Sequence, residues 1–498
     1  MSMIHILLIS ISGIPIALFA VFLEIYPRLK NRLFGVDIWT HLLYLKEYHR
    51  QKGIPGKIES GFIVSGEYDY PPAFIFILSK FPFRLVEHYE FLFSPVFDFI
   101  HLIGIFVFSY FMTQSIVLAL VVQVLYLLTP IVILENSSAT PRSLGYTLFS
   151  IVLLSEFLFL STGGIGFLLC AVVFGSLIFL SHRFTTQGFL FISVFFSLLE
   201  RNLLYLEVLL VSFLIAIALS KGFYLKVFRG HMGNLLFWKD VIKYRFYHQV
   251  KGSFEEHKTE DFVFKLYNQF LKFPPFVLAI TNPWILFVVY MLFFSFPLDP
   301  LLQRLVWWVL WSYILALTTT WIPSLRFLGE GQRYLELSAF PSAFLAAYLL
   351  FSGKFGAMTS LVIFLYCLFG IAALITILVI QYKAIIKDTM RTLTPSMKQM
   401  FEYIKVLDKK PRLLCIPHQI TTSTIYHTGC PVFVNADYTH IHKIKDVYPF
   451  IEKPIKEIMR KYELDMILLN ESYASIEDLK IDEYKIIKKI DNFVLIEA

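Results

Sequence analysis

The most prominent feature of the chain is a series of long apolar runs separated by short polar segments. A membrane-spanning helix needs about 20 apolar residues, and most of these runs approach that length. The pattern predicts a polytopic α-helical membrane protein with about eleven spanning helices. The expected spans are Ile4–Tyr26, Phe91–Met112, Ile116–Leu134, Leu144–Leu160, Ile165–Leu180, Gly188–Leu199, Leu203–Leu219, Pro275–Phe296, Leu305–Ile322, Leu337–Phe351 and Met358–Gln381.

The pattern changes from about Lys383, where charges become frequent and short apolar runs replace the long ones. The short runs predict strands, with helical stretches such as Pro449–Tyr462 between some of them. We therefore expect a transmembrane domain over residues 1–382 and a small soluble α/β domain over 383–498. Because the second domain contains neither a phosphate-cradling glycine loop nor a nucleophile elbow, we interpret it as a lid or docking module. The predicted strands are Arg412–Ile416, Pro431–Asn435, Asp465–Leu469 and Phe493–Ala498.

Composition agrees with a membrane protein. Hydrophobic residues make up 57% of the chain and charged residues 16%, whereas soluble domains carry about a quarter charged residues. The first run is too long for a signal-peptide core and lacks a small-residue cleavage pattern, so we expect a retained helix. The four cysteines show no metal-ligand spacing. The net charge of +7 is spread over loops, which argues against a nucleic-acid partner.

Counting crossings predicts which polar segments share a membrane face. With eleven spans, the first loop (residues 27–90), the Glu135–Arg142 loop, the Pro323–Glu336 loop and the C-terminal tail emerge on one side. The Gly188–Leu199 run decides this count, because it is short and its loss would put the Pro323–Glu336 loop opposite the first loop. We expect the shared face to be extracytoplasmic, in a protein of the plasma membrane.

One basic segment bears on that orientation. Residues Lys221–Lys272 carry ten Lys and Arg against five Asp and Glu, and the positive-inside rule would place such a segment in the cytoplasm. Since long loops obey the rule weakly, we keep the parity and expect amphipathic helices at the membrane interface, anchored by Trp238, Phe246 and Tyr247. A cytoplasmic placement is the alternative.

The first loop carries candidate chemistry at Asp37 and His41. The two residues are four apart, so a helix would project both from one face. Asp37 either caps a helix that begins near Ile38 or is a carboxylate at the membrane surface that takes a proton or binds a metal. His41 is either an interfacial histidine or a second residue of the same site.

A second group in this loop is Glu67-Tyr68-Asp69-Tyr70-Pro71-Pro72. The proline pair predicts the start of a helix. Glu67 and Asp69 are either acids placed favourably before a helix N-terminus or, with Tyr70, part of a binding site.

Two later loops add charges at the ends of apolar runs. Glu135 and Arg142 flank one of them, and together they could hold a phosphate or polarise an acceptor. The other is Arg326–Glu336, where Glu330, Arg333 and Tyr334 stand at the edge of an apolar run. Charges at such an edge are costly unless they are paired or used. Arg333 could clamp a lipid-linked phosphate, or it could pair with Glu330 or Glu336 and stabilise the turn.

Taken in order, four motifs resemble the GT-C superfamily of polyprenyl-phosphate-dependent glycosyltransferases. This superfamily includes protein O-mannosyltransferases, the aminoarabinose transferases of lipid A and oligosaccharyltransferases. The chain lacks the WWDYG-type signature of oligosaccharyltransferases and the Asp-Glu pair that protein O-mannosyltransferases carry in the first loop. The motifs are G-V-D-I-W-T-H around Asp37, Tyr70-Pro71-Pro72, the Ser138–Arg142 loop, and Gln332–Glu336 running on to Pro341.

The resemblance implies an inverting transfer of one sugar from a polyprenyl-phosphate carrier to a glycan, lipid or protein acceptor at the outer face. It implies that Asp37 is the general base and that Arg333, with Arg142, holds the carrier phosphate. His41, Glu67, Asp69, Tyr70, Glu330 and Tyr334 are then candidates for contacts with the substrates. A divalent cation such as Mg²⁺ or Mn²⁺ is optional, because the superfamily has metal-dependent and metal-independent members.

Two other functions remain as alternatives. A transporter or flippase of lipid-linked saccharides would carry ionisable groups near the bilayer midplane, often in repeated halves. The spans here are nearly free of charge and show no repeat. A ligase or polymerase of the O-antigen type would favour a large late loop, whereas the largest polar loop here comes first.

Overall fold

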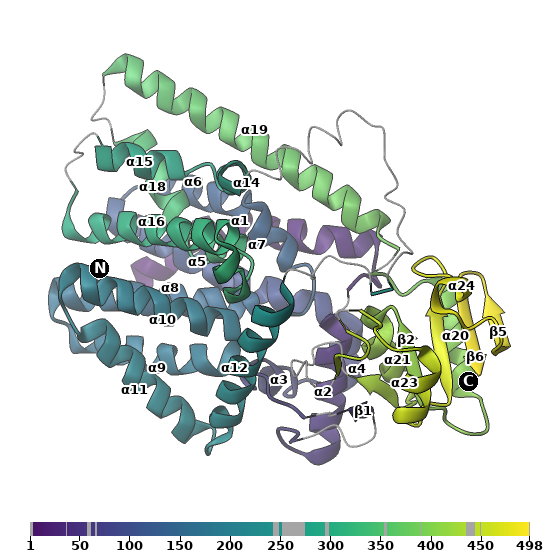
Figure 1. Cartoon of the computed structure of the whole chain (residues 1–498). Coiled ribbons are helices and arrows are strands. Elements are labelled where there is room, and N and C mark those ends of the chain that lie inside the picture. Colours follow the sequence, from purple (N-terminus) through teal and green to yellow (C-terminus); the bar gives the residue numbers. More distant parts are fainter. Residues whose placement is uncertain are drawn as a thin grey trace. The chain divides into compact units, whose positions relative to one another are not determined.

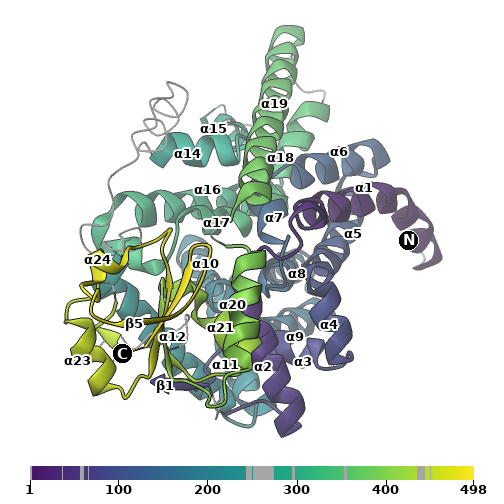
Figure 2. The ribbon, with the colours of Figure 1, turned by 90° about the vertical axis from the view of Figure 1, so that its right-hand side faces the viewer.

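The helices and strands belong to two units of the chain, which is drawn in Figures 1 and 2. The first unit comprises Met1–Arg32, Tyr89–Leu225 and Glu260–Lys387, and the second comprises Leu33–His88, Lys226–Thr259 and Asp388–Ala498. The expected division at residues 382 and 383 stays a prediction. This computed structural model describes residues 3–35, 37–56, 61–64, 67–242, 249–250, 274–293, 298–352, 356–389, 391–434, 444–448 and 450–497.

The first unit is built of helices, and each of the eleven expected apolar runs is mostly helical over its described residues. Helices α8 and α9, α9 and α11, and α10 and α11 pack on each other, and these helices run side by side in Figure 1. Helix α1 packs against α5 and α6. The helices are α1 (Met3–Lys30), α5 (Phe93–Thr113), α6 (Ile116–Leu127), α7 (Pro130–Glu135), α8 (Arg142–Thr162), α9 (Ile165–Ser181), α10 (Arg183–Glu200), α11 (Leu204–Leu219), α14 (Pro274–Thr281), α15 (Ile285–Phe293), α16 (Pro300–Trp321), α17 (Gln332–Glu336), α18 (Ala339–Phe351) and α19 (Ala357–Lys387), with 3-10 turns η1 (Glu90–Leu92) and η3 (Pro323–Leu328).

Five helical segments of the described chain are long and apolar enough to cross a membrane. A sixth is reached if α11 and α12 (Phe223–Val241), which are bent by 119° at their junction, are counted as one span. The chain is therefore a helical membrane protein, while the predicted number of eleven crossings is not confirmed. The five are Ile9–Lys30, Phe83–Thr113, Arg142–Thr162, Pro300–Trp321 and Ala357–Lys387.

Two of the expected spans are broken, and a proline lies at each break. The run Ile116–Leu134 divides into α6 and α7, and Pro130 is the first residue of α7. The run Pro275–Phe296 divides into α14 and α15 around Pro283. Proline has no N–H to donate and its ring clashes with the preceding turn, so a helix ends before it or begins at it. The first break makes α7 a short helix that ends on Glu135.

The second unit contains a six-stranded sheet with strand order β1-β3-β2-β4-β6-β5. The strands β1, β3, β2 and β4 are parallel, and β6 runs antiparallel to both β4 and β5. The four strands that the sequence predicted are confirmed as β2, β3, β4 and β6. The bounds are β1 (Phe62–Val64), β2 (Leu413–Ile416), β3 (Val432–Val434), β4 (Met466–Asn470), β5 (Lys485–Ile490) and β6 (Phe493–Glu497).

The two strands that the sequence analysis missed lie at the edges of this sheet. Strand β5 has the sequence KIIKKI and is mostly exposed, so its lysines suit an edge that faces water. Strand β1 comes from the first loop and pairs with β3, Phe62 opposite Val432 and Val64 opposite Val434. Because β1 has only three residues, it carries too little pattern to be recognised along the sequence.

Helices of the second unit cover this sheet. Phe237 and Val241 of α12 belong to the core that contains Val434 and Ile458, and Trp238 packs partly against it. The other two expected membrane anchors, Phe246 and Tyr247, lie outside the described residues, and the interfacial placement of this segment stays a prediction. The remaining helices are α2 (Asp37–Gln51), α3 (Ala73–Leu78), α4 (Phe83–Tyr89), η4 (His418–Ile420), α20 (Pro395–Lys405), α21 (Thr421–Thr428), α23 (Ile455–Lys461) and α24 (Ile476–Leu479).

Candidate functional site

In the second unit, Asp37 and His41 lie in the first turns of α2. Asp37 is the first residue of the helix and is exposed, and its carboxylate is favourably placed at the positive end of the helix dipole. His41 is buried, and its ring contacts Tyr70 and Phe74 edge-on, with centroid distances of 6.0 and 5.4 Å. The structure thus brings Asp37, His41 and Tyr70 together around the start of α2.

Burial decides the charge of His41. It lowers the pKa of the imidazole to about 4, although the nearby Asp37 carboxylate acts in the opposite direction. His41 is therefore neutral near pH 7, and a neutral imidazole presents one donor and one acceptor. Such a ring can orient a hydroxyl group but cannot neutralise a phosphate.

The acids that precede the proline pair face helix α12 instead. Glu67 is exposed and lies 3.6 Å from the Lys226 ammonium group, which also donates a hydrogen bond to the Gly56 carbonyl. Asp69 is half-buried against Gly230 of α12, where a Cβ atom would stand 2.3 Å from the carboxylate oxygen Oδ2. Glycine is therefore needed at position 230 for this close approach. The proline pair opens α3 at Ala73, as the sequence predicted.

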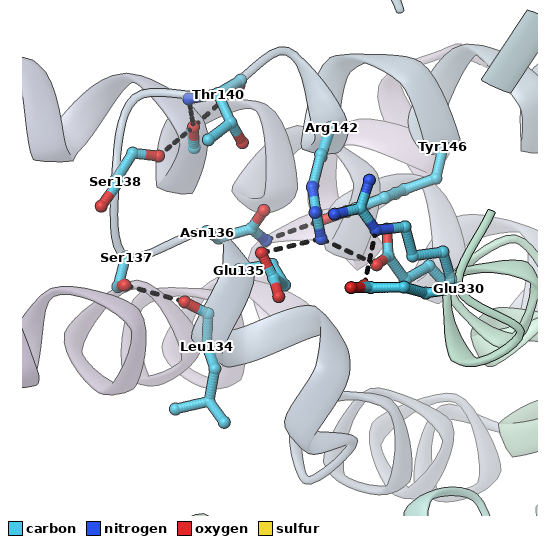
Figure 3. Close-up of polar contacts among 12 residues, drawn as sticks. Leu134, Glu135, Asn136, Ser137, Ser138, Thr140, Arg142, Tyr146 and Glu330 are labelled. Carbon is cyan, nitrogen blue, oxygen red and sulfur yellow. Dashed lines mark hydrogen bonds and ion pairs between the residues drawn. The ribbon is translucent and has the colours of Figure 1, made fainter. Parts of the chain in front are cut away.

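In the first unit, Arg142 stands at the start of α8 between two carboxylates. Its Nη1 lies 2.7 Å from Glu135 Oε2 and 3.0 Å from Glu336 Oε1. Figure 3 shows the Glu135 and Arg142 side chains pointing toward one another. Glu135 is exposed at the end of α7, whereas the side chains of Arg142 and Glu336 are only 10% and 4% exposed. The guanidinium group is thus held at the border between the helical core and the surface.

The second predicted arginine belongs to the same cluster. Arg333 Nε lies 3.0 Å from Glu330 Oε2, within one turn of the chain. Burial raises the pKa of Glu336 to about 7, and the charges of Arg142 and Arg333 oppose that rise. Both arginines therefore act on one carboxyl group, so the structure brings together Arg142, Glu330 and Arg333 although they are far apart in sequence.

Tyr334 faces the protein interior. It is 1% exposed, its hydroxyl donates to the Leu328 carbonyl at 3.0 Å, and Gln187 Nε2 donates to that hydroxyl at 2.7 Å. These bonds connect α10 with the turn η3 and hold the segment that carries Glu330 and Arg333. A contact between Tyr334 and a substrate stays a prediction.

The sequence analysis missed a buried network that fixes the loop before Arg142. Arg28, 2% exposed, pairs with Glu90 and donates to Ser138 Oγ at 3.0 Å and to the Ser137 carbonyl at 3.3 Å. Glu90 in turn accepts a hydrogen bond from the Ala139 amide at 3.2 Å. The signal in the sequence was Arg28 itself, which stands near the end of the first apolar run. A charge at such a position is usually either paired or functional.

The same network continues into the helical core. Asn136 Nδ2 donates to Glu24 Oε1 at 2.6 Å and lies 2.5 Å from the Tyr146 hydroxyl, as Figure 3 shows for Asn136 and Tyr146. The Tyr146 hydroxyl in turn donates to Asp98 Oδ1 at 2.8 Å. Buried side chains of the helical core consequently hold residues Glu135–Arg142 by hydrogen bonds, which gives Arg142 a defined position.

Possible metal ligands do not cluster in the part of the chain that the structure describes. Among the described residues there is no group of three or more His, Cys, Asp or Glu side chains that could hold a metal ion. The steps proposed below are written for the side chains of the protein.

Comparison with known proteins shows which solved structures have a similar fold. No protein-family model matches the chain and no curated protein matches it in sequence. The apo oligosaccharyltransferase of Archaeoglobus fulgidus is similar over 92% of this chain and 69% of its own, with a TM-score of 0.60 and 11% identity. ArnT from Cupriavidus metallidurans bound to undecaprenyl phosphate is similar over 97% of both chains, with a TM-score of 0.51 and 10% identity.

A third structure is that of AglB, the archaeal oligosaccharyltransferase from Archaeoglobus fulgidus, in complex with an inhibitory peptide and a dolichol-phosphate. It is similar over 98% of this chain and 74% of its own, with a TM-score of 0.54 and 10% identity. At such identities the likeness concerns the fold. It extends over nearly the whole chain, and so includes both units.

Proposed function

We propose that this chain, which has the fold of the GT-C glycosyltransferases, transfers a sugar from a polyprenyl-phosphate carrier to an acceptor. The observation that carries the proposal is the likeness over more than nine-tenths of the chain to two kinds of glycosyl-transfer protein. Structures of both kinds contain a polyprenyl phosphate, dolichol-phosphate in one and undecaprenyl phosphate in the other. The acceptor is a glycan, a lipid or a protein, and no nucleic acid takes part.

Asp37 is the general base of this proposal. It is an exposed carboxylate at the start of a helix whose next turn is buried, so it is accessible and anchored at once. The oxygen of the acceptor hydroxyl attacks the anomeric carbon while Asp37 takes the hydroxyl proton. The bond from the anomeric carbon to the phosphate oxygen breaks, and its electron pair leaves with the polyprenyl phosphate. One displacement of this kind inverts the configuration at the anomeric carbon.

Arg142 and Arg333 bind the carrier phosphate. A guanidinium group offers five donors in a fixed plane that matches a phosphate, and the charge on the phosphate grows as it leaves. The surrounding carboxylates Glu135, Glu330 and Glu336 hold both arginines in place before the donor arrives. His41, Glu67, Asp69, Tyr70 and Tyr334 are the proposed contacts with the sugar or the acceptor.

The proposal includes the arrangement in the membrane. With the expected eleven or so crossings, the proposal puts the loop 27–90, the two arginine-bearing segments and the C-terminal domain on the extracytoplasmic side of the plasma membrane. The polyprenyl tail lies among the apolar helices. Mg²⁺ or Mn²⁺ is an optional addition, and transfer measured with and without a chelator decides whether it is needed.

The test is transfer of radiolabelled sugar from a panel of polyprenyl-phosphate sugars by the purified chain in lipid nanodiscs. We compare the wild type with Asp37→Asn and with Asp482→Asn, a control at an exposed acid of the second unit. Loss of a general base costs about 10²- to 10⁴-fold in rate. We expect that loss for Asp37→Asn and none for Asp482→Asn, at equal thermal stability.

The two ways in which this test can fail have different meanings. Transfer that is unaffected by Asp37→Asn keeps the transferase and removes Asp37 as its base. If the wild type consumes no donor across a wide acceptor panel, the transferase itself is wrong. Movement of a lipid-linked saccharide across the membrane of vesicles that contain the same purified chain would then identify a flippase.

A further inference from the structure

The C-terminal segment from Asp388 onward makes specific contacts with the first-loop segment inside the second unit. The first lies just before Asp37. Gly35 donates its amide to the Arg391 carbonyl at 2.9 Å, and Leu393 donates to the Leu33 carbonyl at 3.1 Å. Phe34 and Thr392 thereby form an antiparallel bridge. The φ of Gly35 is 136°, a value that side chains disfavour, so the approach to α2 depends on a glycine.

The second contact lies just after Asp37. The Trp39 ring packs against His427 and Tyr426 of α21, with centroid distances of 4.7 and 5.4 Å. Phe401 of α20 also stacks on His427, with a centroid distance of 5.5 Å. Burial lowers the pKa of His427 to about 4, helped by the nearby lysines, so this ring is neutral near pH 7 and packs as an aromatic group.

A third contact joins α21 to two helices of the first-loop segment, α4 and α2. Tyr426 donates its hydroxyl to the carboxylate of Glu87 in α4, and the Lys46 ammonium group of α2 lies 5.9 Å from the Tyr426 ring centre. Figure 2 shows α2 and α21 side by side. Tyr426 and His427 therefore hold α2 through neighbouring positions of a single short helix.

The fourth contact is strand β1, which pairs with β3 and ends three residues before Glu67. The first loop has two groups of candidate residues, one around Asp37 and one that begins at Glu67. Each group thus follows a stretch of backbone that pairs with the backbone of the C-terminal segment. For Asp37 the restraint is two-sided, because the Phe34 bridge precedes it and the Trp39 contact follows it.

We infer that the C-terminal segment 388–498 positions the general base of the enzyme, and that Trp39 and His427 are the positioning residues through which it does so. The inference rests on the proposed function, since it assigns a task relative to Asp37. It also replaces the expected lid or docking module with an integral part of the catalytic unit. Neither ring touches a substrate in this assignment; each acts by holding the first turn of α2.

The test is a double-mutant cycle in the full-length chain, with Trp39→Ala, His427→Ala and both together. A displacement of a reacting group by about 1 Å costs up to 10²-fold in rate. We expect each single change to lower kcat about tenfold to a hundredfold and to change KM for the donor less than threefold. Because both changes break the shared Trp39–His427 contact, the loss in the double variant should be clearly smaller than the product of the two single losses.

Two further variants separate positioning from general loss of stability. Trp39→Phe keeps an aromatic ring at this position and should recover most of kcat. Tyr448→Ala removes a ring that stacks on Phe237 at 5.7 Å, elsewhere in the same unit, and should lower the unfolding temperature while kcat of the folded protein stays unchanged. Unfolding temperatures of all variants are measured under the assay conditions.

Equal kcat for Trp39→Ala and the wild type would overturn the inference while leaving the transferase intact. Multiplying losses in the double variant would also overturn it, because independent effects do not come from one contact. The proposed function fails differently, since in that case the wild type itself transfers no sugar. If Trp39→Ala does not fold, the cycle is measured with Trp39→Leu and His427→Leu, which keep apolar volume and remove the ring contact.

Discussion

At the scale of single residues, Glu336 shows how buried charges depend on one another. Its side chain is 4% exposed and lies 3.0 Å from Arg142 Nη1. Burial disfavours the charged carboxylate and the arginine favours it, and burial is the larger effect because the pKa rises to about 7. Near neutral pH the group is thus close to half protonated, so the charge around Arg142 varies with pH.

This balance predicts a pH-dependent stability. A carboxyl pKa raised from 4.5 to about 7 means that the folded state holds the proton more tightly than the unfolded chain. The resulting stabilisation is complete below pH 4.5 and is lost as the pH rises through 7, by about 3 kcal/mol in total. We expect Glu336→Gln to flatten the dependence of the unfolding temperature on pH between 5 and 8. Parallel curves for the two proteins would contradict this expectation.

At this scale the sequence indicated a partner only where the two residues are close along the chain. The turn-stabilising pair of Arg333 with Glu330, one of two alternatives, is present at 3.0 Å. The partners of Arg28 and Arg142 come from positions at least 60 residues away as well as from nearby ones. Such pairs depend on how the helices pack, and no spacing along the chain indicates them.

At the scale of elements, glycines decide how closely the helices of the first unit approach. A Cβ at Gly145 of α8 would stand 2.4 Å from Thr185 Oγ1 and 3.2 Å from the Cβ of His182. Thr185 cannot turn away freely, because its hydroxyl is bonded to His182 Nδ1 at 2.9 Å. Small residues of this kind allow membrane helices to pack with their backbones close together.

We therefore expect Gly145→Ala to destabilise the protein by about 1–3 kcal/mol through overpacking. Gly166 of α9 is the matched control, because a Cβ there meets nothing within 4 Å. Gly166→Ala should be neutral or stabilising by up to about 1 kcal/mol, since alanine is the better helix former. Unfolding temperatures in one detergent check both variants. Equal destabilisation by the two would show that packing at Gly145 is not the cause.

The apolar pattern predicted the type of these elements better than their bounds. The short Gly188–Leu199 run is part of a continuous helix, α10, which spans Arg183–Glu200. The predicted helix Pro449–Tyr462 is shorter in the structure, where α23 covers Ile455–Lys461 after Pro454. Proline sets that start because its φ suits a first turn while its ring prevents a helix from continuing through it.

At the scale of the whole molecule, the second unit combines segments that are far apart in sequence. Its sheet takes β1 from the first loop and its other strands from the last ninety residues, and α12 completes the core. Contacts between segments so far apart in sequence carry a loop-closure cost, so we expect the first-loop and C-terminal segments to depend on each other for this sheet.

This arrangement predicts the result of a truncation after Lys387. Without the C-terminal segment, residues 33–88 lose the partner strand of β1 and the rings that cover Trp39. We expect limited proteolysis to cut the truncated chain within residues 33–88, at sites that the full chain protects, with cut sites identified by mass spectrometry. A removable lid would instead leave the cleavage pattern of residues 33–88 unchanged.

The sequence by itself determined the local structure of this protein. Long apolar runs specify helices because each run satisfies its own backbone hydrogen bonds in a helix, and short apolar runs specify four strands of the sheet. Only the tertiary structure decided the partners: β1 beside β3, Trp39 against His427, Arg142 between Glu135 and Glu336. The physical reason is that periodicity encodes which face of an element is buried, whereas the choice of partner depends on packing across the whole fold.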